Sequence, residues 1–464
     1  MRPPVVRAPL DWRDPELVVS RLGAVGDVVW IDAGVDAVEG RSVVAWGTAL
    51  TASAADGDLD EAWQLVRADL ADGTGDADPL GWSGWLGYGM GLWLLDRDGS
   101  LGPGRGAPAR LGARGVPTEG TPPDLALLRT DRALVFDHAR RTVEAVSAVG
   151  AGWIDGVAAR WPDPDVEEAR VGSVPHRASS APPRWAHDDG AYLELVARCR
   201  SAIADGSAYV LCLTTSVAVA GVDDDLAVYR RLRRASAAPR ASFVRIGETA
   251  VLGASPESFL DVTPEGVVSS SPIKGTRPRG GDAGSDARLA HELATSEKER
   301  AENLMIVDLV RNDLIRVCDP GSVEVVELFG VHSYPAVHQL VSTVRGRLRP
   351  GAVGLDAVEA TFPAGSMTGA PKRRAVELLA EWEGRPRGIY SGAIGTFGLD
   401  GGVSLAMVIR SIVVTRPAGA PSTATIGVGG GVTASSVPAD ELAEVKLKAA
   451  ALLRVLEESP TRAS

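Results

Sequence analysis

Short apolar runs separated by glycine, aspartate and arginine characterise the first hundred residues of the chain. Val28–Ile31 and Ser42–Trp46 predict buried strands, and the helical spacing of apolar positions over Glu61–Leu70 predicts a short helix. The glycine- and tryptophan-rich run Trp82–Gly89 predicts a strand whose glycines let another backbone approach closely. An antiparallel strand pair is predicted at Leu125–Phe136 and Thr142–Ala148.

Longer helices and β-branched strands follow from about residue 190. Helices are predicted at Ala191–Asp205, over the periodic segment Asp286–Cys318, from Pro371 onward, and from about Pro438 to Glu457. Strands are predicted at Ala208–Val219, Ala241–Ile246, Ala250–Ser255, Ser391–Phe397, Ser404–Thr415 and Ala424–Val428. Strand pairs joined by short turns, with the helices in separate blocks, predict an α+β fold with large antiparallel sheets.

The chain divides by composition into three parts. Residues 1–160 form an N-terminal part, and residues 161–189, rich in proline, serine, aspartate and alanine, predict a linker-like loop. Residues 190–458 carry most of the candidate chemistry. A further exposed loop is predicted at residues 102–124, which are rich in glycine, proline and arginine.

The composition is that of a globular protein with an acidic balance. Hydrophobic residues make up 45% of the 464 residues and the net charge is −12, which excludes a long disordered chain and argues against nucleic acid or an anionic membrane as the main partner. The three scattered cysteines support neither a disulfide framework nor a zinc site. With no signal peptide and no membrane-spanning apolar stretch, we expect a cytoplasmic protein whose partners are small molecules, metals or proteins.

Two pairs of glutamates lie three residues apart on predicted helices: Glu299 with Glu302, and Glu441 with Glu444. Residues at this spacing share a helix face, so each pair can present its oxygens to one point. Two such helices facing each other would form a carboxylate cage suited to Mg²⁺, which keeps positions open for water and substrate. A solvated helix face is the commoner explanation of such pairs, and the spacing leaves both open.

Backbone and hydroxyl donors gather in two small-residue segments. Gly427–Val432, which includes Gly429 and Gly430, predicts a glycine-rich turn after a strand; its N–H groups can bind a carboxylate or phosphate, or the turn can be purely structural. Phe362–Lys372, which includes Thr368 and Gly369, predicts a hydroxyl-rich loop entering a helix. Its hydroxyls can cap that helix or offer donors to an anion.

Four further side chains are candidates for chemistry. Lys274 lies beside a Gly-Thr turn, and a lysine in a low-dielectric cleft can act as a nucleophile. Glu257 leaves a predicted strand and suits acid–base work if partly buried. Arg410 lies inside an apolar strand, where it suits a bidentate grip on a carboxylate, and His338 precedes another apolar run. The alternatives are a surface lysine, a surface glutamate, an internal salt bridge and a core histidine.

Taken together, these segments resemble the chorismate-utilising enzyme family, whose branches include the anthranilate, aminodeoxychorismate, isochorismate and salicylate synthases. The resemblance runs in family order over roughly residues 200–455, with a weaker likeness toward the N-terminus. The similar stretches are Ser255–Glu257, Pro272–Gly280, Glu299–Asp313, His338–Ser342, Phe362–Lys372, Gly388–Gly395, Ile409–Arg410 and Gly427–Lys448.

The resemblance implies a single large fold of two packed antiparallel sheets flanked by helices, with the active site in a cleft between them. It implies that Mg²⁺, held by Glu302 and Glu444 with Glu299 and Glu441 close by, grips the ring carboxylate of chorismate. Tyr390, Arg410 and the glycine turn would hold the enolpyruvyl carboxylate, and Thr276 and His338 would line the ring. The remaining expected substrate-site residues are Thr368, Gly369, Gly427, Gly429, Gly430 and the cleft lysine Lys448.

The motif around Lys274 selects a branch. Aminodeoxychorismate synthases have lysine in the Pro-Ile-x-Gly-Thr motif, where anthranilate synthases have alanine. The resemblance therefore implies amination at C4, in which Lys274 attacks C2, Glu257 protonates the departing C4 hydroxyl, and ammonia then expels the lysine. Val210 stands where the isochorismate branch has a lysine that activates water, which argues against water as the nucleophile. Val210 and Cys212 also depart from the usual pattern of the amine-transferring branch. Anthranilate synthase component I, which aminates C2 and eliminates pyruvate, is the nearest alternative.

Ammonia in this family comes from a glutamine amidotransferase. We expect a separate glutaminase subunit as partner, because the chain has no residual length for a fused one, and a separate lyase that completes p-aminobenzoate for folate or for a specialised metabolite. Trp30–Ala33 lacks the serine of the tryptophan-sensing element of anthranilate synthases, which argues against feedback by tryptophan. A catalytically idle scaffold that only binds the glutaminase is a hypothesis of another class.

Overall fold

The computed structural model describes residues 4–22, 26–35, 37–73, 78–97, 121–162, 182–236 and 238–457. Most of the loop predicted at 102–124 and of the linker predicted at 161–189 therefore lies outside the described residues. Within the described part of the chain, twenty strands join into one hydrogen-bonded system in which every pairing is antiparallel.

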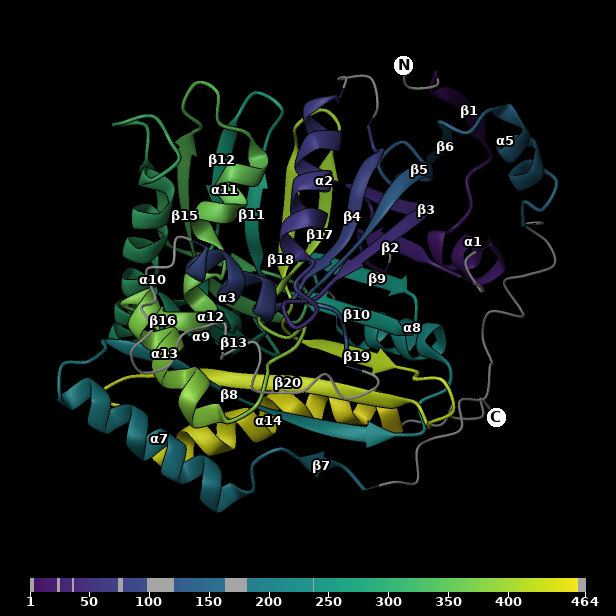
Figure 1. Ribbon diagram of the computed structural model, residues 1–464. Helices are drawn as coiled ribbons and strands as arrows, with labels where there is room; N and C mark the ends of the chain where they lie inside the picture. Colours follow the sequence, from purple (N-terminus) through teal and green to yellow (C-terminus); the bar gives the residue numbers. More distant parts are fainter. Residues whose placement is uncertain are drawn as a thin grey trace.

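The strands divide into two layers that lie across each other (Figure 1). The first layer runs in the order β8 (Val210–Ala220), β20 (Thr423–Val432), β19 (Ser411–Thr415), β10 (Thr249–Ser255), β9 (Arg240–Ile246) and β2 (Val28–Asp32). β7 (Arg184–Trp185) and β16 (Gly369–Ala370) add short pairings to β8.

The second layer continues from β2 without a break in the hydrogen bonding. It runs in the order β3 (Arg41–Ala52), β5 (Leu125–Asp137), β4 (Gly81–Leu86), β17 (Ala393–Gly398), β18 (Val403–Met407), β11 (Ser258–Val262), β12 (Val267–Ser270) and β15 (Val337–Arg347). β13 (Ile273–Pro278) and β14 (Glu324–Ser333) also pair with β15, and β6 (Thr142–Ser147) joins β5 to β1 (Val6–Leu10).

A buried apolar cluster fills the space between the layers. Val29, Val251 and Val413 come from the first layer, whereas Trp85 and Ile394 come from the second. Side chains alternate across a strand, so each layer can bury one face inward and the other under helices. The α+β architecture of two packed antiparallel sheets is confirmed, with the added feature that β2 and β3 link the two sheets into one.

Helices cover both outer faces (Figure 1). The first layer is covered by α7 (Asp189–Ala204), α8 (Asp225–Ala235), α13 (Lys372–Glu383) and α14 (Pro438–Glu457), with α1 (Pro15–Leu22) and α5 (Ala151–Ala158) alongside. The second layer is covered by α2 (Leu59–Ala71), α3 (Tyr88–Asp96), α10 (Glu297–Ile315), α11 (Gly354–Thr361) and α12 (Gly365–Thr368), and α9 (Ala283–Thr295) packs on β13, β14 and β15. No helix in these described ranges is long and apolar enough to cross a membrane.

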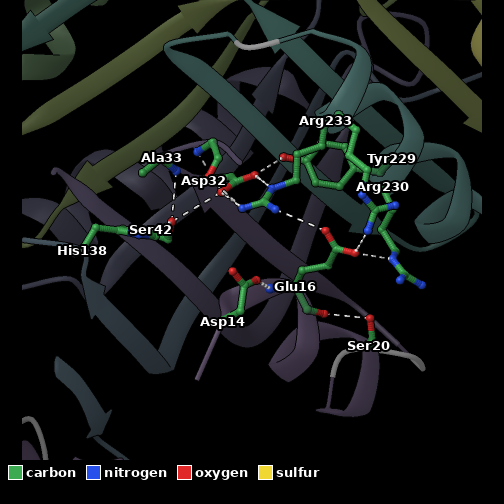
Figure 2. Close-up of polar contacts among 12 residues, drawn as sticks. Asp14, Glu16, Ser20, Asp32, Ala33, Ser42, His138, Tyr229, Arg230 and Arg233 are labelled. Carbon is green, nitrogen blue, oxygen red and sulfur yellow. Dashed lines mark hydrogen bonds and ion pairs between the residues drawn. The ribbon is translucent and has the colours of Figure 1, made fainter. Parts of the chain in front are cut away.

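A buried ionic cluster ties the N-terminal elements to α8 (Figure 2). Arg233 donates from Nε to Oδ2 of Asp32 at 2.5 Å, and Arg230 donates from Nε to Oε1 of Glu16 at 2.7 Å. Tyr229 adds a hydrogen bond to Asp32 at 3.0 Å. Charged groups removed from water need such partners, so this cluster fixes α1 and β2 against α8.

Three sequence predictions are wrong in detail. The segment Asp286–Cys318 is not one helix, because α9 ends at Thr295 and Ser296 caps the start of α10 by accepting from the backbone N–H of Glu299 at 3.4 Å. The strand predicted at Ser404–Thr415 is interrupted between β18 and β19. The strand predicted at Trp82–Gly89 ends at Leu86, and α3 begins at Tyr88.

Candidate active site

Glu257 lies in the short connection between β10 and β11 and is 6% exposed. Its backbone is held by the backbone N–H of Met407, which donates to its carbonyl at 3.1 Å. Burial raises the pKa of the Glu257 carboxyl to about 7, against the opposing effects of the Lys274 charge and a hydrogen bond with Ser366. A carboxyl in this state can give up a proton near neutral pH.

Lys274 stands near the start of β13, at an irregularity where the pairing with β15 shifts across Gly275. Gly275 has φ of 74°, which favours glycine, and a side chain there would press on the carboxylate of Glu299. The positive charge of Lys274 opposes the rise in the pKa of Glu257 and of Glu302, and it helps to lower the pKa of Glu444. Residues that are far apart in sequence therefore surround one lysine.

The two predicted glutamate pairs face a common region. Burial and the neighbouring Glu299 and Glu441 carboxylates raise the pKa of Glu302 on α10. Burial and the neighbouring Glu444 carboxylate raise the pKa of Glu441 on α14. Within the described residues, however, no three His, Cys, Asp or Glu side chains are grouped as a metal-binding cluster.

Lysines balance part of this negative charge. Lys448 lies 2.6 Å from Oε1 of Glu444 and donates to the backbone carbonyl of Gly429 at 2.8 Å. Although burial acts in the opposite direction, the attraction of Lys448 holds the pKa of Glu444 below its usual value. Lys298 lies 3.9 Å from Glu302, so each glutamate pair has a lysine beside it.

The glycine run at Gly427–Val432 is not a turn, because it forms the second half of β20 and pairs in register with β8. The absence of side chains at these glycines instead lets other side chains approach the backbone of β20 closely. A Cβ at Gly427 would overlap the ring of Tyr390, and one at Gly430 would lie 3.2 Å from Oε2 of Glu441. The missing side chains thus make room for two predicted site residues.

Arg410 has no ion-pair or side-chain hydrogen-bond partner among the described residues, so the internal salt bridge is absent from this part of the chain. Its φ of 51° turns the chain between β18 and β19. Burial lowers the pKa of the guanidinium, and the nearby Tyr390 and Glu444 oppose that effect. A partly buried guanidinium that makes no direct ion pair with a described side chain is suited to receive an anion.

The remaining predicted site residues are Thr276, His338, Thr368 and Gly369, and most of them have partners within the protein. Thr276 is exposed, whereas His338 is 1% exposed and lies 2.8 Å through Nδ1 from Ser333 Oγ and 2.9 Å through Nε2 from Asp286 Oδ1. Thr368 donates its hydroxyl to the carbonyl of Ala364 at 3.1 Å within α12, so it does not cap the following helix. Gly369 allows the contact between β16 and β8.

Comparison with known proteins identifies the group to which the chain is related. The chorismate binding enzyme family matches residues 104–454, which is well over half of the sequence. The chain belongs to the chorismate-binding enzyme family.

Two relatives and one solved structure place the chain within this family. It is 47% identical over 352 residues to an aminodeoxychorismate synthase of Streptomyces griseus, covering 72% of this chain and 47% of that protein. It is 37% identical over 335 residues to aminodeoxychorismate synthase component 1 of Klebsiella aerogenes, covering 72% of this chain and 71% of that protein. Anthranilate synthase component I from Streptococcus pneumoniae has a similar structure, with a TM-score of 0.74 and 25% identity over 89% of this chain and 92% of that one. The chain thus spans about half the length of its Streptomyces griseus relative.

Two buried ion pairs in this chorismate-binding enzyme were missed as functional candidates. Lys372 lies 2.6 Å from Asp313, and Arg387 lies 2.7 Å from Glu383 while donating to the backbone carbonyl of Cys212 at 2.9 Å. Ser366, which contacts Glu257, was also missed. Asp313 on α10 and Lys372 and Glu383 on α13 are charged residues at buried helix positions, but the sequence alone does not show which charged residues pair across the fold.

Proposed function

We propose that this chain is an aminodeoxychorismate synthase component I, which aminates chorismate at C4 to give 4-amino-4-deoxychorismate. The observation that carries the proposal is the position of Lys274 beside Glu257, a buried carboxyl whose pKa is raised to about 7. A nucleophile and an acid in one place match a substitution in which a hydroxyl must leave as water. The 47% identity to the Streptomyces griseus aminodeoxychorismate synthase supports the same assignment.

The first proposed step uses the neutral amine of Lys274. Its nitrogen attacks C2 of the ring, the ring double bonds shift, and the C4–O bond breaks. Glu257 transfers its proton to the departing hydroxyl, which leaves as water. The lysine nitrogen is then a substituted ammonium bonded to C2, and Glu257 is a carboxylate.

The second proposed step uses ammonia. Its nitrogen attacks C4, the double bonds shift back, and the C2–N bond breaks to return Lys274 as a neutral amine. The new ammonium at C4 gives one proton to Glu257, which restores the acid. The enolpyruvyl group is retained, because no step removes the proton from C2 as pyruvate elimination would require.

Chorismate would be held by its two carboxylates. Arg410 and Tyr390 would bind the enolpyruvyl carboxylate, which the absence of a counter-ion for Arg410 among the described residues supports. Mg²⁺ would be held by Glu302 and Glu444, with Glu299 and Glu441 close by. When bound, the ion supplies the positive charge that grips the ring carboxylate.

The residues present fit this ion. The raised pKa values of Glu302 and Glu441 reflect burial and mutual repulsion of carboxylates, which a cation would relieve. Mg²⁺ commonly uses one or two protein carboxylates and takes its other ligands from water and substrate. A site of this kind needs no cluster of three protein ligands.

Ammonia is proposed to come from a glutamine amidotransferase subunit, and the product would pass to a lyase that forms p-aminobenzoate. The alternative is anthranilate synthase component I, favoured by the structural similarity to that enzyme. The position of Lys274 separates the two, because direct amination at C2 has no need of a lysine nucleophile.

Product analysis tests the proposal. The purified chain is incubated with chorismate, Mg²⁺ and ammonium, with and without a cognate glutaminase plus glutamine, and the products are separated by mass. We expect an aminated product that keeps the enolpyruvyl group and gives p-aminobenzoate when a lyase is added. Anthranilate with pyruvate would support the alternative, and no product under any condition would favour the idle scaffold.

A Lys274→Ala variant tests the covalent step. Its C4 amination should fall by at least about a thousandfold, because the nucleophile is gone. An Arg311→Ala variant, which changes an exposed cation on α10, serves as the control. Unchanged C4 amination by Lys274→Ala would refute the lysine intermediate while leaving the product assignment intact.

A further inference from the structure

A small cavity of about 10 Å³ lies against Glu257, between the second layer and the helices that cover it. Glu257, Asp313 of α10, Ser366 of α12 and Ser270 of β12 are the polar residues among those that line it, together with Thr361 of α11. Most of the wall surface is apolar, and Val310 of α10 forms part of it. A cavity of this size accepts one water molecule when several polar groups line it.

Asp313 is a buried carboxylate that the proposed reaction does not use. Its Oδ2 accepts a hydrogen bond of 2.6 Å from the ammonium of Lys372, which also donates to the carbonyl of Thr361 at 2.8 Å. Asp313 and Lys372 are 6% and 9% exposed. Among the described residues, no side chain or backbone N–H donates to Oδ1 of Asp313, so this oxygen can accept a further hydrogen bond.

We propose that one water molecule occupies this cavity and donates hydrogen bonds to both Asp313 and Glu257, which makes Asp313 a positioning residue for the acid. Burial raises the pKa of Asp313, and the ammonium of Lys372 opposes that rise. An ionised carboxylate can only accept, so Asp313 in its ion pair with Lys372 fixes one proton of the water toward itself. The second proton of the water then points to Glu257. This inference rests on the proposed function, in which Glu257 is the acid.

The water would act on Glu257 in two ways. An oxygen that accepts from the water is not the oxygen that carries the carboxyl proton, so the proton is placed on the other oxygen, available to the substrate. When Glu257 gives up that proton, the hydrogen bond from the water stabilises the carboxylate that forms. A hydrogen bond to a charged group is worth about tenfold or more in rate at such a step.

Among the described residues, three charged side chains stand on the sides of Glu257 that matter here. Lys274 faces it from β13, and across the cavity stand Asp313 from α10 and its partner Lys372 from α13. Because a donor to the carboxylate stabilises the charged form, loss of the water should raise the pKa of Glu257 further. The alkaline limb of the activity profile, where the acid is lost, should then move to higher pH.

The test displaces the water without changing any charge. Val310→Ile adds one methylene at the cavity wall, and Val307→Ile adds the same group to the buried face of α10 at a residue that does not line the cavity. We expect Val310→Ile to lower kcat for C4 amination by about tenfold or more, with an unchanged KM for chorismate and an alkaline limb at higher pH. Val307→Ile should change none of these.

Two further measurements address Asp313 and the water directly. Asp313→Asn alone would leave Lys372 buried without its partner, so the double variant Asp313→Asn/Lys372→Met is used, and its kcat should also fall at unchanged KM. A high-resolution crystal structure of the wild-type chain should show one ordered water in contact with Glu257 and Asp313. A dry cavity, or wild-type kcat in both Val310→Ile and the double variant, would overturn the inference.

These outcomes separate the inference from the proposed function. If the wild-type chain makes no aminated product, the proposed function fails and the crystal structure alone decides whether the water is present. If the wild type is active and Glu257→Gln is inactive while Val310→Ile behaves as wild type, only the water-mediated role fails.

Discussion

The buried carboxyl of Glu257 makes the stability of the fold depend on pH in a way that a single substitution can isolate. Burial raises its pKa from 4.5 to about 7, which corresponds to about 3 kcal/mol of preference for the protonated form. At a pH below the pKa that Glu257 has in the unfolded chain, the carboxyl is protonated in both states, and its full contribution to the free energy of unfolding is present. As pH rises toward about 7 the unfolded chain ionises first, so about 3 kcal/mol of the free energy of unfolding is lost.

Glu257→Gln keeps the shape of the side chain and removes this titration. The difference in unfolding free energy between the variant and the wild type should therefore change by about 3 kcal/mol, in favour of the variant, between about pH 4 and about pH 8. Urea unfolding followed by tryptophan fluorescence at a series of pH values measures it, with the exposed Glu324→Gln as the control. A difference that stays constant across this range would refute the assignment of Glu257 as a group held protonated by burial.

Three other substitutions address the anion and metal sites. Arg410→Gln should raise the KM for chorismate in steady-state kinetics by about tenfold to a hundredfold, with a smaller effect on kcat, because a charge-assisted hydrogen bond is lost. An unchanged KM would contradict the anion site. Gly427→Ala should weaken chorismate binding, because the added Cβ overlaps the ring of Tyr390; a binding titration measures this. An unchanged affinity would show that the Tyr390 ring has no part in chorismate binding. Glu302→Gln should raise the Mg²⁺ concentration needed for half-maximal activity by at least about tenfold, whereas an unaltered requirement would exclude Glu302 as a ligand.

Periodicity predicted most of the elements of the fold. The last helix was predicted at Pro438–Glu457 and α14 has these bounds, because a proline in the first turn and a long apolar stripe mark it clearly. The β9–β10 pair was also predicted, since two β-branched runs separated by a short turn can pair locally. The break at Ser296 was hidden because the apolar spacing continues through it, and the capping hydroxyl is the only local sign.

Local sequence patterns do not predict that site residues far apart in the chain come together in the fold. Lys274, Glu257 and Glu302 lie on separate elements, and only the resemblance to a known family connected them. The sequence predicts a turn at the glycine run because glycine favours turns, whereas in β20 the glycines make room for Tyr390 and Glu441. The pairing of Asp313 with Lys372 depends on how α10 packs near the start of α13, which neither segment encodes alone.

The break between β18 and β19 shows how the fold holds a functional side chain in place. Arg410 has φ of 51°, a left-handed conformation that costs a non-glycine residue about 1 kcal/mol or more. Backbone hydrogen bonds offset this cost. The backbone N–H of Ala254 donates to the carbonyl of Arg410 at 3.2 Å, and β19 then pairs with both β10 and β20. A regular strand would carry the chain straight on within the second layer. The turn instead transfers it to the first layer and leaves the guanidinium beside Tyr390, so the irregularity that ends the strand also builds the proposed anion site.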